Sequence, residues 1–484
     1  MPQVGTVGQA VANAGLRCES KDVMKLSRHS LMVTFLSALM LAGSTSSYAI
    51  DKARYRELSQ KLSDAAKQKD WQAARAVLTE IGRELPAPTP RYLLSVATIE
   101  ARLGHKDEAL RWIQKYVATG LSFDPSKDAD LNPLMTAGTG AKVAALMKEH
   151  SLPVTKAEFV CELPQADTMP EDISYLKSSD AKSAGSFYVS SIQHHTIYRV
   201  SLPKAGGRQC AMEELPLPSE AKRWPTLAVS ADPTRKVLWL TASAMPGFSG
   251  FAKEDEGKAV LMEIDPASGK VLHRFDLATT GPAVLGDMCV TDQGTVFVTD
   301  SVGGGVYRLH GDLQTAKLEK IADGFFSPQT PVLARDGKRL FVADYTMGIA
   351  VIDLPAAGAA ANLAAKLNYL PHPENVAMVG LDGLYRNGDS LIGVQNGTEP
   401  ERIMRFAMNA AQTEITGAQV IHQIGQLDPT HAVEVDGWFY TTANVGWSKV
   451  DDNTGQLKPG EKFTPPVLLR FPVDAPLRSK PPAK

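Results

Sequence analysis

Two spacings of hydrophobic residues divide the chain into two parts. From about residue 51 to residue 150, apolar residues recur three and four positions apart, which places them on one face of an α-helix. From about residue 155 onward, short apolar runs alternate with Gly, Pro, Asp and Asn, a pattern typical of β-strands joined by tight turns. We therefore expect a small helical domain at residues 50–152, a larger all-β domain at residues 155–475 and a disordered tail at residues 476–484.

The β-rich part contains six similar strand cores that begin about 50 residues apart. Several follow a polar turn such as "DQG" or "RDGK" and precede a second strand that contains arginine, such as "GVYRL". A repeat of about 40–50 residues that holds several short strands is typical of a β-propeller, in which each repeat forms one blade. The sequence thus predicts an all-β six-bladed propeller after the helical domain. The cores are "FYVSS" (187–191), "LWLTAS" (238–243), "VFVTDS" (296–301), "LFVADY" (340–345), "LIGVQN" (391–396) and "FYTTAN" (439–444).

Three consecutive glycines follow the third strand core, in "VFVTDSVGGGVYRL". A glycine-rich phosphate loop needs a helix directly after it, with the N-terminal amides of that helix directed at the anion. Here another strand of alternating apolar residues follows instead. The glycines are therefore expected to form a hairpin loop.

Two segments of the helical part align at a period near 34 residues. Ala74 and Leu78 in the first segment correspond to Ala109 and Ile113 in the second. Small and apolar residues at such positions allow two helices to pack closely, as in tetratricopeptide repeats. We expect a tetratricopeptide-like module that either binds an exported protein partner or serves as a structural cap.

The first 49 residues have the pattern of a secretory signal peptide, preceded by upstream residues. Lys25 and Arg28 come before the apolar run "LMVTFLSALMLAG", and small residues follow this run up to Ala49. The run is too short to span a bilayer, which takes about 20 residues. We expect cleavage after Ala49, a periplasmic or secreted protein, and no membrane association once the signal is removed.

Charge and cysteine content limit the possible partners. The chain has 51 Lys and Arg against 53 Asp and Glu. It therefore lacks the surplus of basic residues that would indicate nucleic-acid binding. Three cysteines follow the signal peptide. An oxidising compartment permits a disulfide between Cys161 and Cys210, and three unpaired cysteines, with Cys289, are the alternative. The chain has no CxxC motif or Cys/His cluster of the kind that binds zinc.

A polar residue recurs just before the main strand of each repeat, where the central channel of a propeller lies. Carboxylate and amide oxygens that converge on one axis suit a hard cation such as Ca²⁺, Mg²⁺ or Mn²⁺. The alternative is that these side chains cap turns and bind channel waters. A bound cation would polarise a carbonyl group or activate a water, as in lactone or ester hydrolysis. The six positions hold Glu171, Thr226, Asp287, Gln329, Asp382 and His431.

Several strings resemble the senescence marker protein/gluconolactonase (regucalcin-like) superfamily of six-bladed propellers. They include "PEDISY", "GDMCVTDQGTVFVTDS", "SPQTPVLARDGKRLFVADY" and "LDGLYRNGDSLIGVQNG". The resemblance implies a divalent cation, Ca²⁺ first, held by Glu171, Gln329 and Asp382. It also implies that Asp382 is the catalytic base that activates water. Gln329 stands where the family has a metal-binding Asn.

The same resemblance assigns residues to the substrate. Asp287 stands where the family has an assisting Asn, and we expect it to contact a small-molecule substrate together with His431 and Asn396. His194 and His195 are adjacent and are expected on a blade rim, and the chain has no GxSxG nucleophile elbow.

Two hypotheses of function follow from these observations. The first is an exported, metal-dependent hydrolase of a lactone or small ester. The alternative is a non-enzymatic ligand- or protein-binding scaffold of the periplasm, because a fold does not dictate a function. A condensing enzyme like the related strictosidine synthases is a third possibility that no residue singles out.

Overall fold

The fold is taken from a computed structural model of the chain. The expected signal peptide, its cleavage site and the tail at residues 476–484 lie outside the residues that the structure describes. The described residues are 50–154, 157–178, 185–204, 206–355, 361–363, 365–423, 428–451 and 454–472.

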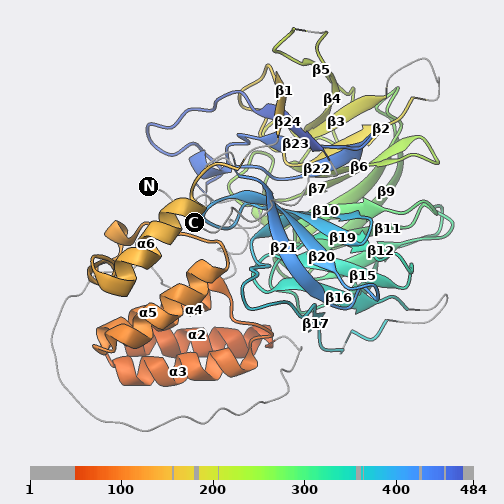
Figure 1. The fold of residues 1–484 in the computed structure, drawn as a ribbon. Helices are drawn as coiled ribbons and strands as arrows, with labels where there is room; N and C mark the ends of the chain where they lie inside the picture. Colours follow the sequence, from red (N-terminus) through yellow and green to blue (C-terminus); the bar gives the residue numbers. More distant parts are fainter. Residues whose placement is uncertain are drawn as a thin grey trace.

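Six four-stranded antiparallel sheets form the β-rich part, which confirms the predicted six-bladed propeller (Figure 1). In five sheets the strands follow one another in sequence, and the first strands of neighbouring sheets contact each other around the axis. These sheets are β2 (Ile173–Leu176), β3 (Ser186–Ser191), β4 (Thr196–Ser201) and β5 (Ala211–Glu214); β6 (Thr226–Asp232), β7 (Val237–Ser243), β8 (Lys258–Ile264) and β9 (Val271–Ala278); β10 (Leu285–Val290), β11 (Val296–Asp300), β12 (Val306–Leu309) and β13 (Glu319–Ala322); β14 (Pro328–Leu333), β15 (Arg339–Asp344), β16 (Gly348–Asp353) and β17 (Asn368–Tyr369); β18 (Leu381–Asn387), β19 (Ser390–Gln395), β20 (Arg402–Met408) and β21 (Ile415–His422).

The predicted strand cores are the second strands of the six sheets. The core at residues 238–243 becomes β7, and all seven residues of this strand are buried. Blades that stack face to face cover both sides of such strands, which explains why apolar residues run continuously rather than alternate. The three glycines lie in the loop between β11 and β12, as the sequence predicts.

The sixth sheet closes the ring with the two ends of the β-rich part. Its order is β22 (Ala432–Val435), β23 (Trp438–Ala443), β24 (Val467–Pro472) and then β1 (Glu158–Glu162). β1 is the earliest strand in the sequence, and it pairs with the last. This pairing joins the two ends of the β-rich part within one blade and so closes the ring.

A disulfide joins the two sheets that meet at this closure. Cys161 lies in β1 of the sixth sheet, and Cys210 directly precedes β5 of the first sheet. The two Cα atoms are 5.5 Å apart, and both side chains are buried. Cys289 is a free cysteine in β10. The structure thus has the disulfide that an oxidising compartment would permit.

Within the described residues, five α-helices precede the propeller and pack beside it (Figure 1). Side chains cap three of them: the Asp51 carboxylate accepts hydrogen bonds from two backbone amides of the first helix, and Asp70 and Thr89 cap the next two. The helices are α2 (Lys52–Lys67), α3 (Trp71–Glu84), α4 (Pro90–Arg102), α5 (Lys106–Ala118) and α6 (Gly138–His150), with short 3₁₀ turns η2 (Pro125–Lys127) and η3 (Asn132–Met135).

A buried arginine connects the helical region to the propeller. Arg402, at the start of β20, is 2% exposed, and its guanidinium donates hydrogen bonds to the carbonyls of Thr119 and Gly120, just after α5. Its Nε also donates to Gln395 Oε1 at 2.6 Å. Because the end of a helix carries unsatisfied carbonyls and a partial negative charge, a cation there is stabilised without a carboxylate partner.

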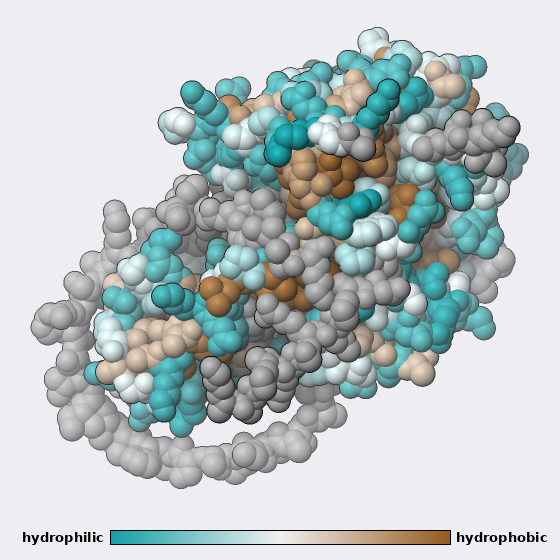
Figure 2. Space-filling view, turned by 45° about the horizontal axis from the view of Figure 1, so that its top comes forward, coloured by the Kyte–Doolittle hydropathy of each residue, from teal (hydrophilic) through white to brown (hydrophobic). Residues whose placement is uncertain are grey.

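On the face shown in Figure 2, the coloured residues are mostly hydrophilic, with hydrophobic residues gathered in patches. Among the described residues, no helix has both the length and the apolar character that crossing a membrane requires.

We predict that the disulfide contributes strongly to stability because it crosses the closure of the ring. In the chain-entropy description, a cross-link between residues 49 positions apart stabilises by about 4 kcal/mol. Replacing both Cys161 and Cys210 with Ser should lower the free energy of unfolding by roughly this amount in urea titrations. Cys289→Ser is the control and should change it by less than about 1 kcal/mol. Equal stability of the double variant and the control would contradict the prediction.

Candidate functional site

The six polar residues predicted from the repeats all lie at the starts of the innermost strands. Each is at most 3% exposed, and together they mark the same end of the six blades. They are Glu171 before β2, Thr226 in β6, Asp287 in β10, Gln329 in β14, Asp382 in β18 and His431 before β22.

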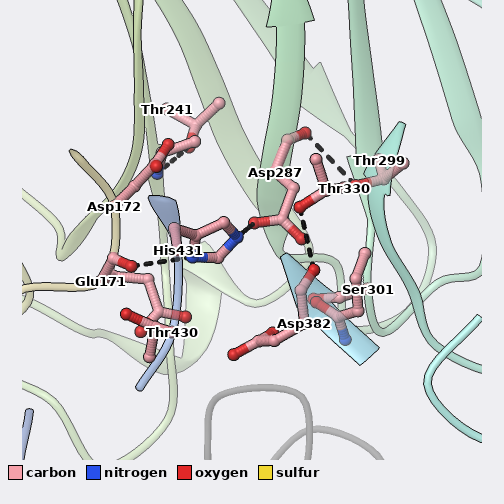
Figure 3. A network of polar contacts seen from close by, with 12 residues as sticks. Glu171, Asp172, Thr241, Asp287, Thr299, Ser301, Thr330, Asp382, Thr430 and His431 are labelled. Atoms are coloured by element: carbon pink, nitrogen blue, oxygen red, sulfur yellow. Dashed lines mark hydrogen bonds and ion pairs between the residues drawn. The ribbon is translucent and has the colours of Figure 1, made fainter. Parts of the chain in front are cut away.

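His431 lies between two acidic residues at this axis (Figure 3). Its Nδ1 is 2.8 Å from the backbone carbonyl oxygen of Glu171, and its Nε2 is 2.7 Å from Asp287 Oδ1. A carbonyl oxygen only accepts hydrogen bonds, so Nδ1 carries a proton. The contact of Nε2 with a carboxylate then favours the doubly protonated, positively charged imidazolium.

The side-chain amide of Asn396 orients the carboxylate of Asp382. Asp382 Oδ2 accepts a hydrogen bond of 2.6 Å from the side-chain nitrogen of Asn396. Asn396 also donates to the carbonyl of Pro429 and accepts from the hydroxyl of Tyr345, so the fold occupies its whole side chain. The other oxygen of Asp382, Oδ1, is buried and has no hydrogen-bond partner within the described part of the chain.

Glu171 is bound by a tryptophan from a distant loop. Trp447 donates its indole N–H to Glu171 Oε2 at 2.7 Å, and this tryptophan is 1% exposed. Trp447 lies in the segment of residues 444–466 that connects β23 to β24, which we call the cover segment. No motif in the sequence marked Trp447. The length of the cover segment was a signal that could have marked it, because the corresponding connection is short in the first, third, fourth and fifth blades.

The cluster holds more carboxylates than positively charged groups, and all of these side chains are buried. Burial raises the pKa of Glu171 well above its ordinary value, and Asp382 acts in the same direction. Burial likewise raises the pKa of Asp382 to about 7, helped by Asp287 and opposed by His431 and Asn396. Carboxylates so close together cannot all ionise unless a proton or a cation sits among them.

The surrounding carboxylates also change the pKa of His431. Burial alone lowers the pKa of His431, but Asp287 and Asp172 oppose this effect, and the net result lies well above the ordinary value. Asp172, adjacent to Glu171, accepts backbone hydrogen bonds from Val229 and Ile173. His431 is therefore the positive partner of a set of carboxylates that outnumber it.

Two carboxylates of the cluster could hold a metal ion together, with His431 close beside them. One ligand atom each from Glu171, Asp382 and His431 lies within 4.8 Å of the other two. Oxygen ligands 2.3–2.6 Å from one Ca²⁺ can be up to about 5 Å apart, so this spacing fits. The structure thus brings Glu171 and Asp382 together. His431 lies beside them, but both of its ring nitrogens are engaged by Glu171 and Asp287, so it is not a ligand in this arrangement. Gln329 donates its amide N–H to Ser327 Oγ at 3.0 Å, and its role as a ligand stays a prediction.

Apolar loops cover this end of the channel. They form one hydrophobic cluster to which the cover segment contributes Val445, Trp447 and Val450. The polar residues of the cluster lie beneath these apolar side chains and are not exposed to solvent. The remaining buried members are Met169, Ile192, Leu227, Met245 and Val284.

No family model matches this chain, and no curated protein matches it. Solved structures with partial similarity include the PQQ-bound aldose sugar dehydrogenase from Streptomyces coelicolor, with a TM-score of 0.40, 13% identity and coverage of 66% of this chain and 99% of that one. A luciferin-regenerating enzyme has a TM-score of 0.41 and 12% identity over 66% of this chain and 95% of that one. A catalytically inactive virginiamycin B lyase from Staphylococcus aureus, with quinupristin, has a TM-score of 0.37 and 14% identity over 59% and 81%.

The bond between Trp447 and Glu171 leads to a prediction about stability. Trp447→Phe keeps most of the packing but leaves a buried carboxylate oxygen without its donor, which costs about 1–3 kcal/mol. Trp239→Phe is a matched control, because Trp239 is 0% exposed and its indole N–H has no hydrogen-bond partner among the described residues. In urea titrations Trp447→Phe should lose more stability than Trp239→Phe by this margin. The reverse order would show that the hydrogen bond is unimportant.

Proposed function

We propose that the protein is an exported, divalent-cation-dependent hydrolase of a lactone or small ester. The observation that carries this proposal is the buried excess of carboxylates at the propeller axis, where ligand oxygens of Glu171 and Asp382 lie within 4.8 Å of each other. A hard divalent cation would neutralise that excess and accept the buried Asp382 oxygen that lacks a partner. The sequence resemblance to the regucalcin-like superfamily supports the same assignment.

Glu171 and Asp382 would hold the cation, with Gln329 as a further oxygen ligand and Ca²⁺ as the first candidate. Such a cation, when bound, polarises a carbonyl oxygen and lowers the pKa of a bound water. Asp382 then takes the proton from the attacking water through its carboxylate. Asn396 fixes the orientation of Asp382 through the 2.6 Å hydrogen bond, and so acts as a positioning residue rather than a substrate contact.

The ion pair of His431 with Asp287 would contact the substrate. His431, held at 2.7 Å from Asp287, would donate a proton to the leaving alkoxide when the acyl–oxygen bond breaks. Substrate would reach these groups only if the apolar loops over the cluster moved, because each of the groups is at most 3% exposed. The disulfide of Cys161 with Cys210 supports export, since such bonds persist in oxidising compartments.

A second candidate function is a non-enzymatic binding scaffold. The observation that favours it is the complete burial of the cluster under apolar loops, which would make a bound cation a structural element. The helical region would then supply the surface for an exported protein partner.

Cation binding is the first test. We expect the chelator-treated protein to gain thermal stability on addition of Ca²⁺ or Mn²⁺, because a ligand that binds only the folded state stabilises it. Asp382→Asn removes a ligand charge and should abolish this shift. Asp232→Asn is the control, because Asp232 is equally buried but caps a turn at the other end of an inner strand. No shift in the wild type with any divalent cation would overturn the cation site.

Hydrolysis is the second test. Wild-type protein with the cation should hydrolyse members of a panel of sugar lactones and small esters, and Asp382→Ala should reduce kcat/KM by at least about 100-fold. The Asp232→Asn control should retain activity. A protein that binds the cation but hydrolyses nothing in the panel would favour the scaffold instead.

A further inference from the structure

Three loops on the rim of the propeller bring together a serine, a histidine and a backbone carbonyl. The hydroxyl of Ser249 lies 3.0 Å from His195 Nε2, and His195 Nδ1 lies 3.1 Å from the carbonyl oxygen of Lys222. His195 is in the turn between β3 and β4, Lys222 is in the connection from β5 to β6, and Ser249 is in the loop between β7 and β8. None of these residues belongs to the cluster at the axis.

The hydrogen bonds determine which nitrogen of His195 carries the proton. Nδ1 must donate, because the carbonyl of Lys222 can only accept. In the neutral ring Nε2 then has the free lone pair and accepts the hydroxyl proton of Ser249. Burial lowers the pKa of His195, opposed by the carbonyls of Lys222 and Arg223, which favours the neutral ring. This tautomer is the one that a histidine needs to act as a base toward serine.

The backbone at His195 is unusual for a residue with a side chain. Its φ is +54°, in the left-handed region that costs a non-glycine residue about 1 kcal/mol or more. The third blade has Gly304 in the corresponding loop between β11 and β12, with a φ of +87°. The first blade therefore has a histidine where glycine would relieve strain, and the side chain of this histidine is fully engaged in the two contacts.

Ser249 is held against the loop that orients His195, yet it is exposed to solvent. The next residue, Gly250, has a φ of +75°, and a Cβ there would lie 2.0 Å from the carbonyl oxygen of Arg223. Only glycine permits such a close approach of two backbones. The approach fixes the serine beside the buried histidine while its hydroxyl stays accessible.

We propose that Ser249 is a nucleophile for carboxylic esters, with His195 as its general base and the Lys222 carbonyl as the group that positions the imidazole. This activity goes beyond the cation-dependent hydrolysis proposed for the axis, because it needs no metal and passes through a covalent acyl-serine.

The reaction balances with water as the only co-reactant. Ser249 Oγ forms a bond to the acyl carbon while its proton passes to His195 Nε2. The bond from the acyl carbon to the alcohol oxygen breaks, and the alcohol leaves with that proton. Water, deprotonated by His195, then attacks the acyl-serine, releases the carboxylic acid and restores the serine.

Diisopropyl fluorophosphate tests the nucleophile directly, because it phosphorylates activated serines with loss of fluoride. We expect mass spectrometry of the wild-type protein to find the adduct on Ser249, and Ser249→Ala to lose it. His195→Asn should slow labelling at least about 100-fold, and asparagine tolerates the left-handed backbone, so the fold should be kept. Unchanged circular dichroism and melting temperature of His195→Asn confirm that only the base was lost.

The controls separate this site from its surroundings and from the axis. Ser268→Ala removes an exposed serine from a neighbouring turn of the same sheet, and His194→Asn removes the adjacent imidazole; neither should slow the labelling of Ser249. Chelator and Asp382→Asn should also leave labelling unchanged, so failure of the axial site does not affect this result. No adduct on Ser249, or equal labelling rates in wild type and His195→Asn, would overturn the proposal.

Discussion

Closing six antiparallel sheets into one ring forces the first residues of the inner strands to meet at the axis. The hydrogen bonds of the sheets pair the backbone, so side chains alone decide what that axis contains. The chain closes the ring by pairing β1 with β24 and links the sheets on either side of this closure by the disulfide of Cys161 and Cys210. Every other property of the axis depends on this closure, because an open array would leave the same carboxylates in water.

Burial both strengthens the electrostatic interactions of the axial cluster and separates it from solvent. In a medium of low dielectric constant, repulsion among carboxylates and their attraction to His431 are both stronger than in water. Apolar loops cover the cluster, and a hydrogen bond from Trp447 to Glu171 connects the cover segment to it. A change in the charge at Glu171 would therefore act on the loop that closes the site.

Loops at this end of the propeller contact one another. Phe248, beside Ser249, packs edge-to-face against Trp447 with ring centroids 6.0 Å apart. The serine–histidine pair and the cover segment thus share an apolar boundary. On another side, Arg402 and Lys52 fix the helical region to the propeller, and Lys52 is near the carboxylates of Asp344 and Asp300.

The fold was readable from the sequence because each blade repeats the same local pattern. A repeat of similar strand cores forces a ring of blades, and the polar residue before each inner strand was correctly located at the axis. The helical part was also readable, because its apolar spacing is a local feature. The alternatives that remained open concerned contacts between residues far apart in the chain.

Those contacts were decided by the tertiary structure alone. The hydrogen bond of Trp447 to Glu171 joins residues 276 positions apart, and that of Ser249 to His195 joins residues 54 positions apart. No local sequence pattern predicts contacts over such separations. The orientation of His431, which depends on both Glu171 and Asp287, is likewise a product of ring closure. By itself the sequence determined which residues reach the axis, because the repeat of strands and turns is a local pattern. The tertiary structure decided which side chains these residues contact, because the contacting residues come from other blades.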